Sequence, residues 1–84
     1  MPRLADLGGV VIRVYFNDTG AHREPHFHAV AAEQQALVSI RTLEVLAGRL
    51  GTTEWRKVRR WAKRHHGLLV ETWNTCNRQQ RLES

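Results

Sequence analysis

Two histidines separated by a single residue are the first feature of this sequence that could do chemistry. They lie in a Pro-His-Phe-His segment at residues 25–28. If the segment is extended, His26 and His28 point to the same face, about 7 Å apart, and Phe27 points into the core. Two neighbouring imidazoles can act as general base and general acid in phosphodiester cleavage, or they can ligate a metal ion. His26 and His28 are therefore candidate catalytic residues, although such a pair is equally typical of a half-buried sheet face or a protein interface.

The loop before this segment holds Asp18 and His22, which could supply a third metal ligand or orient an imidazole. Because a His-x-His pattern is common by chance, we predict no bound metal and no cofactor. A metal site that includes His22, His26 and His28 stays open as an alternative. A second histidine pair, at residues 65–66, lies near a predicted helix C-terminus, where it compensates the helix dipole.

A run of cations between residues 56 and 64 is the second feature. Helical spacing places these cations on one face of a helix whose other face is apolar. The cationic face consists of Arg56, Lys57, Arg59, Arg60, Lys63 and Arg64. The apolar face consists of Trp55, Val58, Trp61, Ala62 and His65. A row of cations can follow a phosphate backbone and release its counterions, so we predict contact with RNA or DNA; a solvated face or a dock for an acidic partner is the alternative.

The charge distribution points in the same direction. Residues 1–51 hold five Arg and five acidic residues, whereas residues 52–84 hold eight Lys or Arg against three Glu, so the net charge of +5 lies in the C-terminal part. Such asymmetry favours a polyanion or an acidic protein as partner. The single cysteine, Cys76, excludes an internal disulfide and a multi-cysteine zinc site. With no apolar run near the roughly 20 residues of a membrane span, we expect a cytoplasmic protein without membrane contact.

The elements that must position these residues divide the chain into two parts. Residues 1–84 are short enough for one domain only. The β-branched and aromatic run at residues 10–16, after Gly8-Gly9, predicts a strand, and residues 26–31 and 36–41 predict a hairpin. Residues 42–50 fit either a short fourth strand or a helical turn, and we favour the strand. The sequence thus predicts a small antiparallel sheet of three to four strands within residues 9–50.

The period then changes from two to 3.6 residues, which predicts two C-terminal helices at residues 53–66 and 67–76. Thr52 or Thr53 could cap the first helix, and His66-Gly67 could end or kink it. We interpret the three Trp residues as core anchors and Cys76 as a small apolar filler. The predicted fold class is α+β.

The overall pattern resembles a small bacterial domain family of unknown function. The resemblance covers most of residues 4–74 and is carried by Val-Ile-Arg-Val-Tyr-Phe at residues 11–16, an Asn-Asp turn, Pro-His-Phe-His at residues 25–28, Val-Ser-Ile at residues 38–40, Glu-Val-Leu-Ala-Gly at residues 44–48 and a Trp-Ala helix. Members of that family are often encoded beside a second small protein, as in toxin–antitoxin operons. The resemblance therefore implies a two-protein module with nucleic-acid contact.

We accordingly expect a component of a toxin–antitoxin-like pair that binds a small protein encoded nearby and contacts RNA or DNA through the cationic helix face. One alternative is a small ribonuclease-type toxin with His26 and His28 as acid and base, and another is a metal-binding accessory or scaffold protein; whether the chain is an enzyme stays open. Because two helices cover only one sheet face, the face with His26 and His28 and a neighbouring strand edge are expected to form a homodimer or heterodimer surface.

Overall fold

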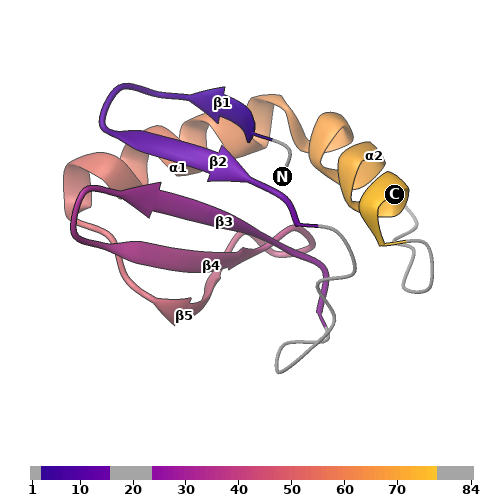
Figure 1. Cartoon of the computed structure of the whole chain (residues 1–84), viewed down its shortest axis with the longest axis horizontal. Helices are drawn as coiled ribbons and strands as arrows, with labels where there is room; N and C mark the ends of the chain where they lie inside the picture. Colours follow the sequence, from indigo (N-terminus) through magenta and orange to yellow (C-terminus); the bar gives the residue numbers. More distant parts are fainter. Residues whose placement is uncertain (1–2, 16–23, 78–84) are drawn as a thin grey trace.

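The structure is a computed structural model that describes residues 3–15 and 24–77 of the 84-residue chain. Within these ranges five strands precede two helices (Figure 1). The elements are β1 (Arg3–Asp6), β2 (Val10–Arg13), β3 (His26–Ala31), β4 (Gln35–Ser39), β5 (Val45–Gly48), α1 (Thr52–Arg64) and α2 (His66–Cys76). The strands form one antiparallel sheet in the order β1-β2-β3-β4-β5. The predicted α+β class is confirmed, with five strands instead of three to four.

The additional strand is β1, which precedes the Gly8-Gly9 pair. Both glycines have positive φ, +77° and +89°, and the N–H of Leu7 donates to the carbonyl oxygen of Val10 at 2.9 Å. This geometry is a two-residue hairpin turn of the mirror-image type, which needs positive φ at both central positions. Gly8-Gly9 therefore joins two strands instead of opening the sheet.

The predicted hairpin of β3 and β4 is confirmed, as is the strand in the ambiguous segment 42–50, which is β5. Between β4 and β5 the chain turns at Leu43, whose φ is +61°. The Oγ of Ser39 fixes this turn by accepting the N–H groups of Arg41 and Thr42, each at 3.1 Å. The sheet thus runs through short connections from β3 to β5.

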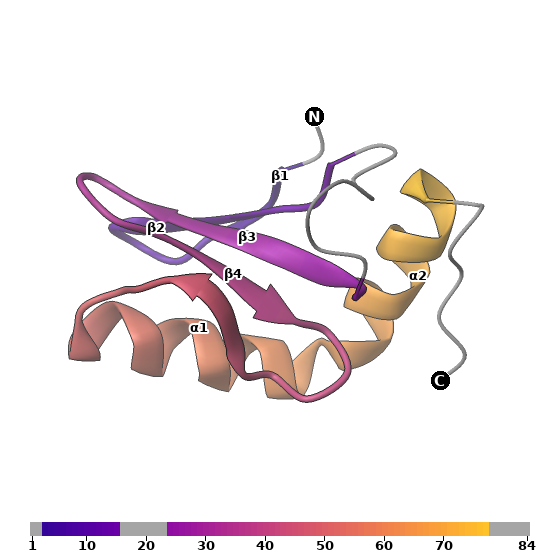
Figure 2. The same cartoon turned by 90° about the horizontal axis from the view of Figure 1, so that it is seen from below.

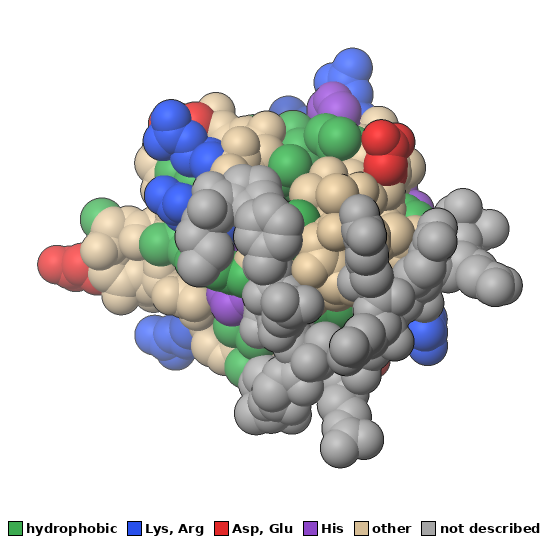
Figure 3. Space-filling model, turned by 45° about the vertical axis from the view of Figure 1, so that its right-hand side comes forward, with side chains coloured by type: hydrophobic (Ala, Val, Ile, Leu, Met, Phe, Trp, Pro, Cys, Tyr) green, Lys and Arg blue, Asp and Glu red, His purple; other side chains and the backbone are tan. Residues whose placement is uncertain are grey.

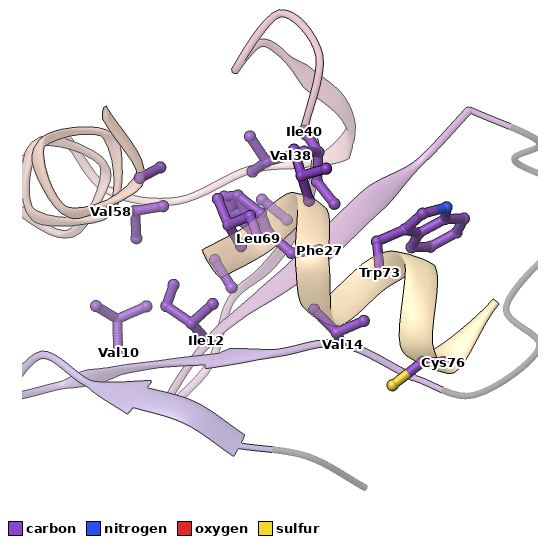
Figure 4. Packing of buried hydrophobic residues seen from close by; sticks show 14 residues of the cluster. Val10, Ile12, Val14, Phe27, Val38, Ile40, Val58, Leu69, Trp73 and Cys76 are labelled. Carbon is purple, nitrogen blue, oxygen red and sulfur yellow. The ribbon is translucent and has the colours of Figure 1, made fainter. Parts of the chain in front are cut away.

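The helices cover one face of the sheet. α1 lies along that face, and after a break at His65 α2 rises past the end of the sheet (Figure 2). The core fills the space between these layers (Figure 4). Its fully buried members include Val10 and Ile12 from β2, Val14 just after that strand, and Val58 from α1. Phe16, the last residue of the predicted strand at residues 10–16, lies outside the described residues.

Three details of the predicted helices are corrected. α1 begins at Thr52 and its N-cap is Gly51, which has no side chain to cap the helix. The N–H of Gly51 donates to Oε1 of Gln34 at 2.7 Å. The helices meet at His65, one residue before the predicted break. Among the three predicted aromatic anchors only Trp73 is fully buried; Trp55 and Trp61 are partly buried at the border of the core.

In the described part of the chain, neither helix combines the length and apolar character that a membrane crossing requires.

Candidate functional site

The predicted histidine pair lies on the face of β3 that points away from α1. Phe27 and Ala29 alternate with the histidines and are buried in the core, so the shared face of His26 and His28 is confirmed. The two imidazole centroids are 5.3 Å apart. His28 meets Tyr15 edge-on, with the ring centroids 4.3 Å apart. The imidazole of His26 packs against the indole of Trp73, with the ring centroids 5.3 Å apart, because α2 reaches past the end of the sheet.

Hydrogen bonds give the two imidazoles different proton positions. The Nδ1 of His26 lies 2.8 Å from the carbonyl oxygen of Glu24, which can only accept, so Nδ1 carries a proton. The Nδ1 of His28 lies 3.2 Å from Nε2 of Gln35, which can only donate, so this Nδ1 accepts. The side chains also differ in depth: His26 is 1% exposed, whereas His28 is half-buried. A phosphodiester must reach both members of an acid–base pair, so the depth of His26 favours a packing role for it.

Ser39, a polar residue that the sequence did not single out, completes this cluster. Ser39 is the cross-strand partner of His26 and is fully buried. Its hydroxyl donates to Oε2 of Glu24 while accepting the two N–H groups of the β4–β5 turn. Both its donor and its acceptor capacity are thereby used for structure. The hairpin register, which pairs position 26 with position 39, is the signal that could have brought Ser39 to attention.

The predicted metal alternative can be followed only in part. Within residues 3–15 and 24–77, no three His, Cys, Asp or Glu side chains come together in a way that could hold a metal ion. Asp18 and His22 lie outside the described residues.

The second histidine pair, His65 and His66, makes specific contacts in addition to its interaction with the helix dipole. Nε2 of His66 donates to the carbonyl oxygen of Ile40 at 2.7 Å, and Nδ1 of His65 donates to the carbonyl oxygen of Trp61 at 3.0 Å.

The predicted cationic helix face forms as one surface. All six cations are exposed on α1, and the buried residues Val58 and Ala62 lie on the opposite side of the helix. We call this surface the basic face; it consists of Arg56, Lys57, Arg59, Arg60, Lys63 and Arg64. Nζ of Lys57 donates to the carbonyl oxygen of Gly8 at 2.9 Å, which ties the β1–β2 turn to the helix.

Two shallow hollows flank the basic face, and each contains a tryptophan. The first, of about 290 Å³, is lined by Leu7, Lys57, Arg60, Trp61, Arg64 and His65. The second, of about 470 Å³, is lined by Thr52, Trp55, Arg56, Arg59, Arg60 and Lys63. Positions 55 and 61 each lie about 60° from Val58 around the helix, on opposite sides of the buried stripe. The helical pattern places them on the apolar face, and the structure shows that the buried part of this face is narrow enough to leave both at its border with the cations.

The basic face and the histidine cluster lie on opposite sides of the molecule. The cluster is on the outer face of the sheet, whereas the basic face is on the side of α1 that points away from the sheet, with the core between them (Figure 2). Figure 3, which brings the right-hand side of Figure 1 forward, shows Lys and Arg side chains at separate places on that side. The structure therefore brings the six cations together with two tryptophans, and does not bring them together with His26 and His28.

Comparison with known proteins adds a family. None of the curated proteins and none of the solved structures matches the chain. One family model matches residues 9–74, a stretch that includes β2 to β5, α1, the histidine pair and the whole basic face. This agrees with the resemblance to a domain family of unknown function. Because the match spans most of the length of the chain, the chain belongs to the family described as a domain of unknown function (DUF4160).

Proposed function

We propose that this protein binds nucleic acid through the basic face and works as one member of a bacterial two-protein module of the toxin–antitoxin type. The observation that carries the first half is the exposure of six cations on one side of α1, a helix in which Glu54 is the one acidic residue. Neighbouring cations on a rigid helix can contact successive phosphates without reordering the backbone. The proposal places no enzymatic activity on this surface.

The number of cations sets the expected salt dependence. If all six contact phosphates, the logarithm of the binding constant falls with the logarithm of the salt concentration with a slope of about −4 for a single strand and about −5 for duplex DNA. Between about 50 and about 200 mM salt, affinity for a single strand then drops roughly 300-fold. A face that is merely solvated has no such dependence, because it binds nothing.

The experiment is fluorescence anisotropy with fluorescein-labelled single-stranded RNA and duplex DNA over this salt range. Arg56→Glu with Arg60→Glu should abolish most of the binding at low salt. Arg3→Glu with Arg41→Glu changes the net charge equally at exposed positions outside α1, and should leave most of the binding intact. Absence of binding by the natural chain at low salt, or an equal loss in both double variants, would refute the proposal.

The second half of the proposal concerns the partner protein that the family resemblance implies. The edge strands β1 and β5 have four residues each, with register shifts in their pairing, features that protect a sheet edge against strand addition. The outer face of the sheet is more suitable, since Val11 faces Val30 and His28 faces Leu37 across neighbouring strands there, all half-buried. We place the protein–protein contact on this face, on the side opposite the nucleic acid.

The ribonuclease alternative receives less support from the same geometry. It requires RNA held by the basic face to reach His26 and His28, which lie beyond the core and the sheet. It also requires access to His26, which packs against Trp73 with 1% of its surface exposed. A metal-binding role stays a separate alternative, for which trace-metal analysis of the purified chain is the direct test.

A further inference from the structure

The first hollow beside the basic face contains a stacked aromatic pair. The rings of Trp61 and His65 are 4.9 Å apart between centroids, with 20° between their planes. The imidazole is exposed, yet Nδ1 donates to the carbonyl oxygen of Trp61 at 3.0 Å, which fixes its rotation. A histidine at the end of a helix can extend into solvent at a lower cost in side-chain entropy. This one is instead held parallel to an indole, in the orientation that a planar ligand needs.

The surroundings of the pair match the two parts of a nucleotide. Arg60 and Arg64 line the hollow at one helical turn from each other, where they can contact the phosphates on either side of a base. Leu7, in the β1–β2 turn, adds an apolar wall. With about 290 Å³, the hollow is near the lower end of the range for small-ligand sites. This volume is suitable for a single base, and a duplex is too wide to enter.

We propose that the Trp61–His65 pair is a stacking site for one unpaired nucleobase, so that the nucleic acid on the basic face is single-stranded. The proposal rests on the proposed function and narrows its ligand. In a duplex the bases stack on one another and present mainly their backbone, whereas a single strand offers the flat face of each base to an aromatic side chain. RNA and DNA strands share this chemistry.

The second hollow gives the strand a path. Arg60 lines both hollows, so a strand that leaves the first one crosses the basic face and meets the second, where Trp55 is the aromatic side chain. The two tryptophans are six positions apart, a rise of about 9 Å along the helix. The alternation of aromatic, cationic and aromatic groups is typical of surfaces that bind single strands with little sequence preference.

The test compares single-stranded RNA, single-stranded DNA of the same sequence and duplex DNA by fluorescence anisotropy at low salt. His65→Ala removes the exposed ring without touching the core, and Trp61→Ala removes the partly buried one. Each substitution should weaken single-strand binding by about 5- to about 150-fold, the usual effect of losing one stacked base, and leave duplex binding unchanged. Trp61→Phe, which retains a ring, should lose less than Trp61→Ala. Circular dichroism of every variant verifies that it is folded.

The outcomes separate this inference from the proposed function. If the natural chain binds duplex as tightly as single strands, and His65→Ala and Trp61→Ala leave both affinities unchanged, the stacking site is refuted. The proposed function then still stands, provided that reversal of Arg56 and Arg60 abolishes binding. If neither ligand binds at low salt, the proposed function fails and the stacking site with it. If the RNA or the DNA single strand binds more tightly than the duplex, the result supports the stacking site. The tighter of the two single strands is then the one that the protein prefers.

Discussion

Replacement of tryptophan by phenylalanine at two positions tests which helix anchors the core. Trp73 in α2 is fully buried, whereas Trp61 in α1 is partly buried beside the basic face. The chemical change is identical at both positions, so a difference in stability reports their burial. Trp73→Phe leaves a cavity against His26 and should cost roughly 1–3 kcal/mol of unfolding free energy. Trp61→Phe, whose ring is partly in solvent, should cost less than about 1 kcal/mol.

Because the domain is small, phenylalanine is a better replacement than alanine for measuring the contribution of Trp73 to stability. Deletion of a large buried aromatic costs about 3–5 kcal/mol, which is close to the whole stability of a domain this small. Trp73→Ala is therefore expected to be largely unfolded in water, so it would give no measurable transition. Phenylalanine retains most of the apolar volume and leaves a folded population to titrate.

The assay is urea unfolding followed by far-ultraviolet circular dichroism, because fluorescence would change with the number of tryptophans. With a slope near 1 kcal/mol per M for a small domain, a loss of about 2 kcal/mol lowers the midpoint by about 2 M. The midpoint for Trp61→Phe should stay within about 1 M of that of the natural chain. Equal shifts would mean that both helices supply an aromatic anchor, and a larger shift for Trp61→Phe would mean that α1 supplies the main one; either result contradicts the reasoning.

Two further predictions concern the sheet face and the cysteine. His28→Asp places a carboxylate on the outer face of the sheet, where we expect a second copy of the chain to bind, so analytical ultracentrifugation should show a dimer for the natural chain and a monomer for the variant. A natural chain that is monomeric on its own excludes the homodimer. Burial raises the pKa of the Cys76 thiol, so the unfolded chain loses this proton at lower pH than the folded one. The folded state should therefore lose stability relative to Cys76→Ala as the pH rises through the usual thiol range, with no such difference near neutral pH; equal urea midpoints in both chains across that range would contradict it.

The strands that the sequence predicts correctly carry their own signal. β3 begins and ends where predicted, because Phe27 and Ala29 alternate with polar or less buried residues between turn-forming segments. β1 has no such signal: Arg3–Asp6 contains no β-branched or aromatic residue. It is a strand because the Gly8-Gly9 turn returns the chain antiparallel to β2. Sheet pairing of this kind depends on the neighbouring strand, which local propensity does not describe.

The candidate site also has parts that could be predicted from the sequence and parts that could not. The basic face could be predicted because helical periodicity alone places six cations on one side. The depth of the aromatic residues could not, because it depends on how much of α1 the sheet covers. Only Val58 and Ala62 are fully buried in α1, so the covered stripe is narrow, and Trp55, Trp61 and His65 lie along its border. Likewise, the shared face of His26 and His28 follows from strand periodicity, but the burial of His26 depends on where α2 places Trp73.

The narrow buried stripe of α1 also connects stability with binding. The burial of only two small side chains, Val58 and Ala62, gives α1 little hydrophobic stabilisation. The partly buried tryptophans must therefore contribute to holding α1 on the sheet, while one part of each ring faces the hollows. A substitution at Trp61 consequently changes both the packing of α1 and the surface offered to a base. His65 is exposed and contributes to the stack without contributing to the core. For this reason His65→Ala, and not Trp61→Ala, isolates the proposed binding role of the pair from its structural one.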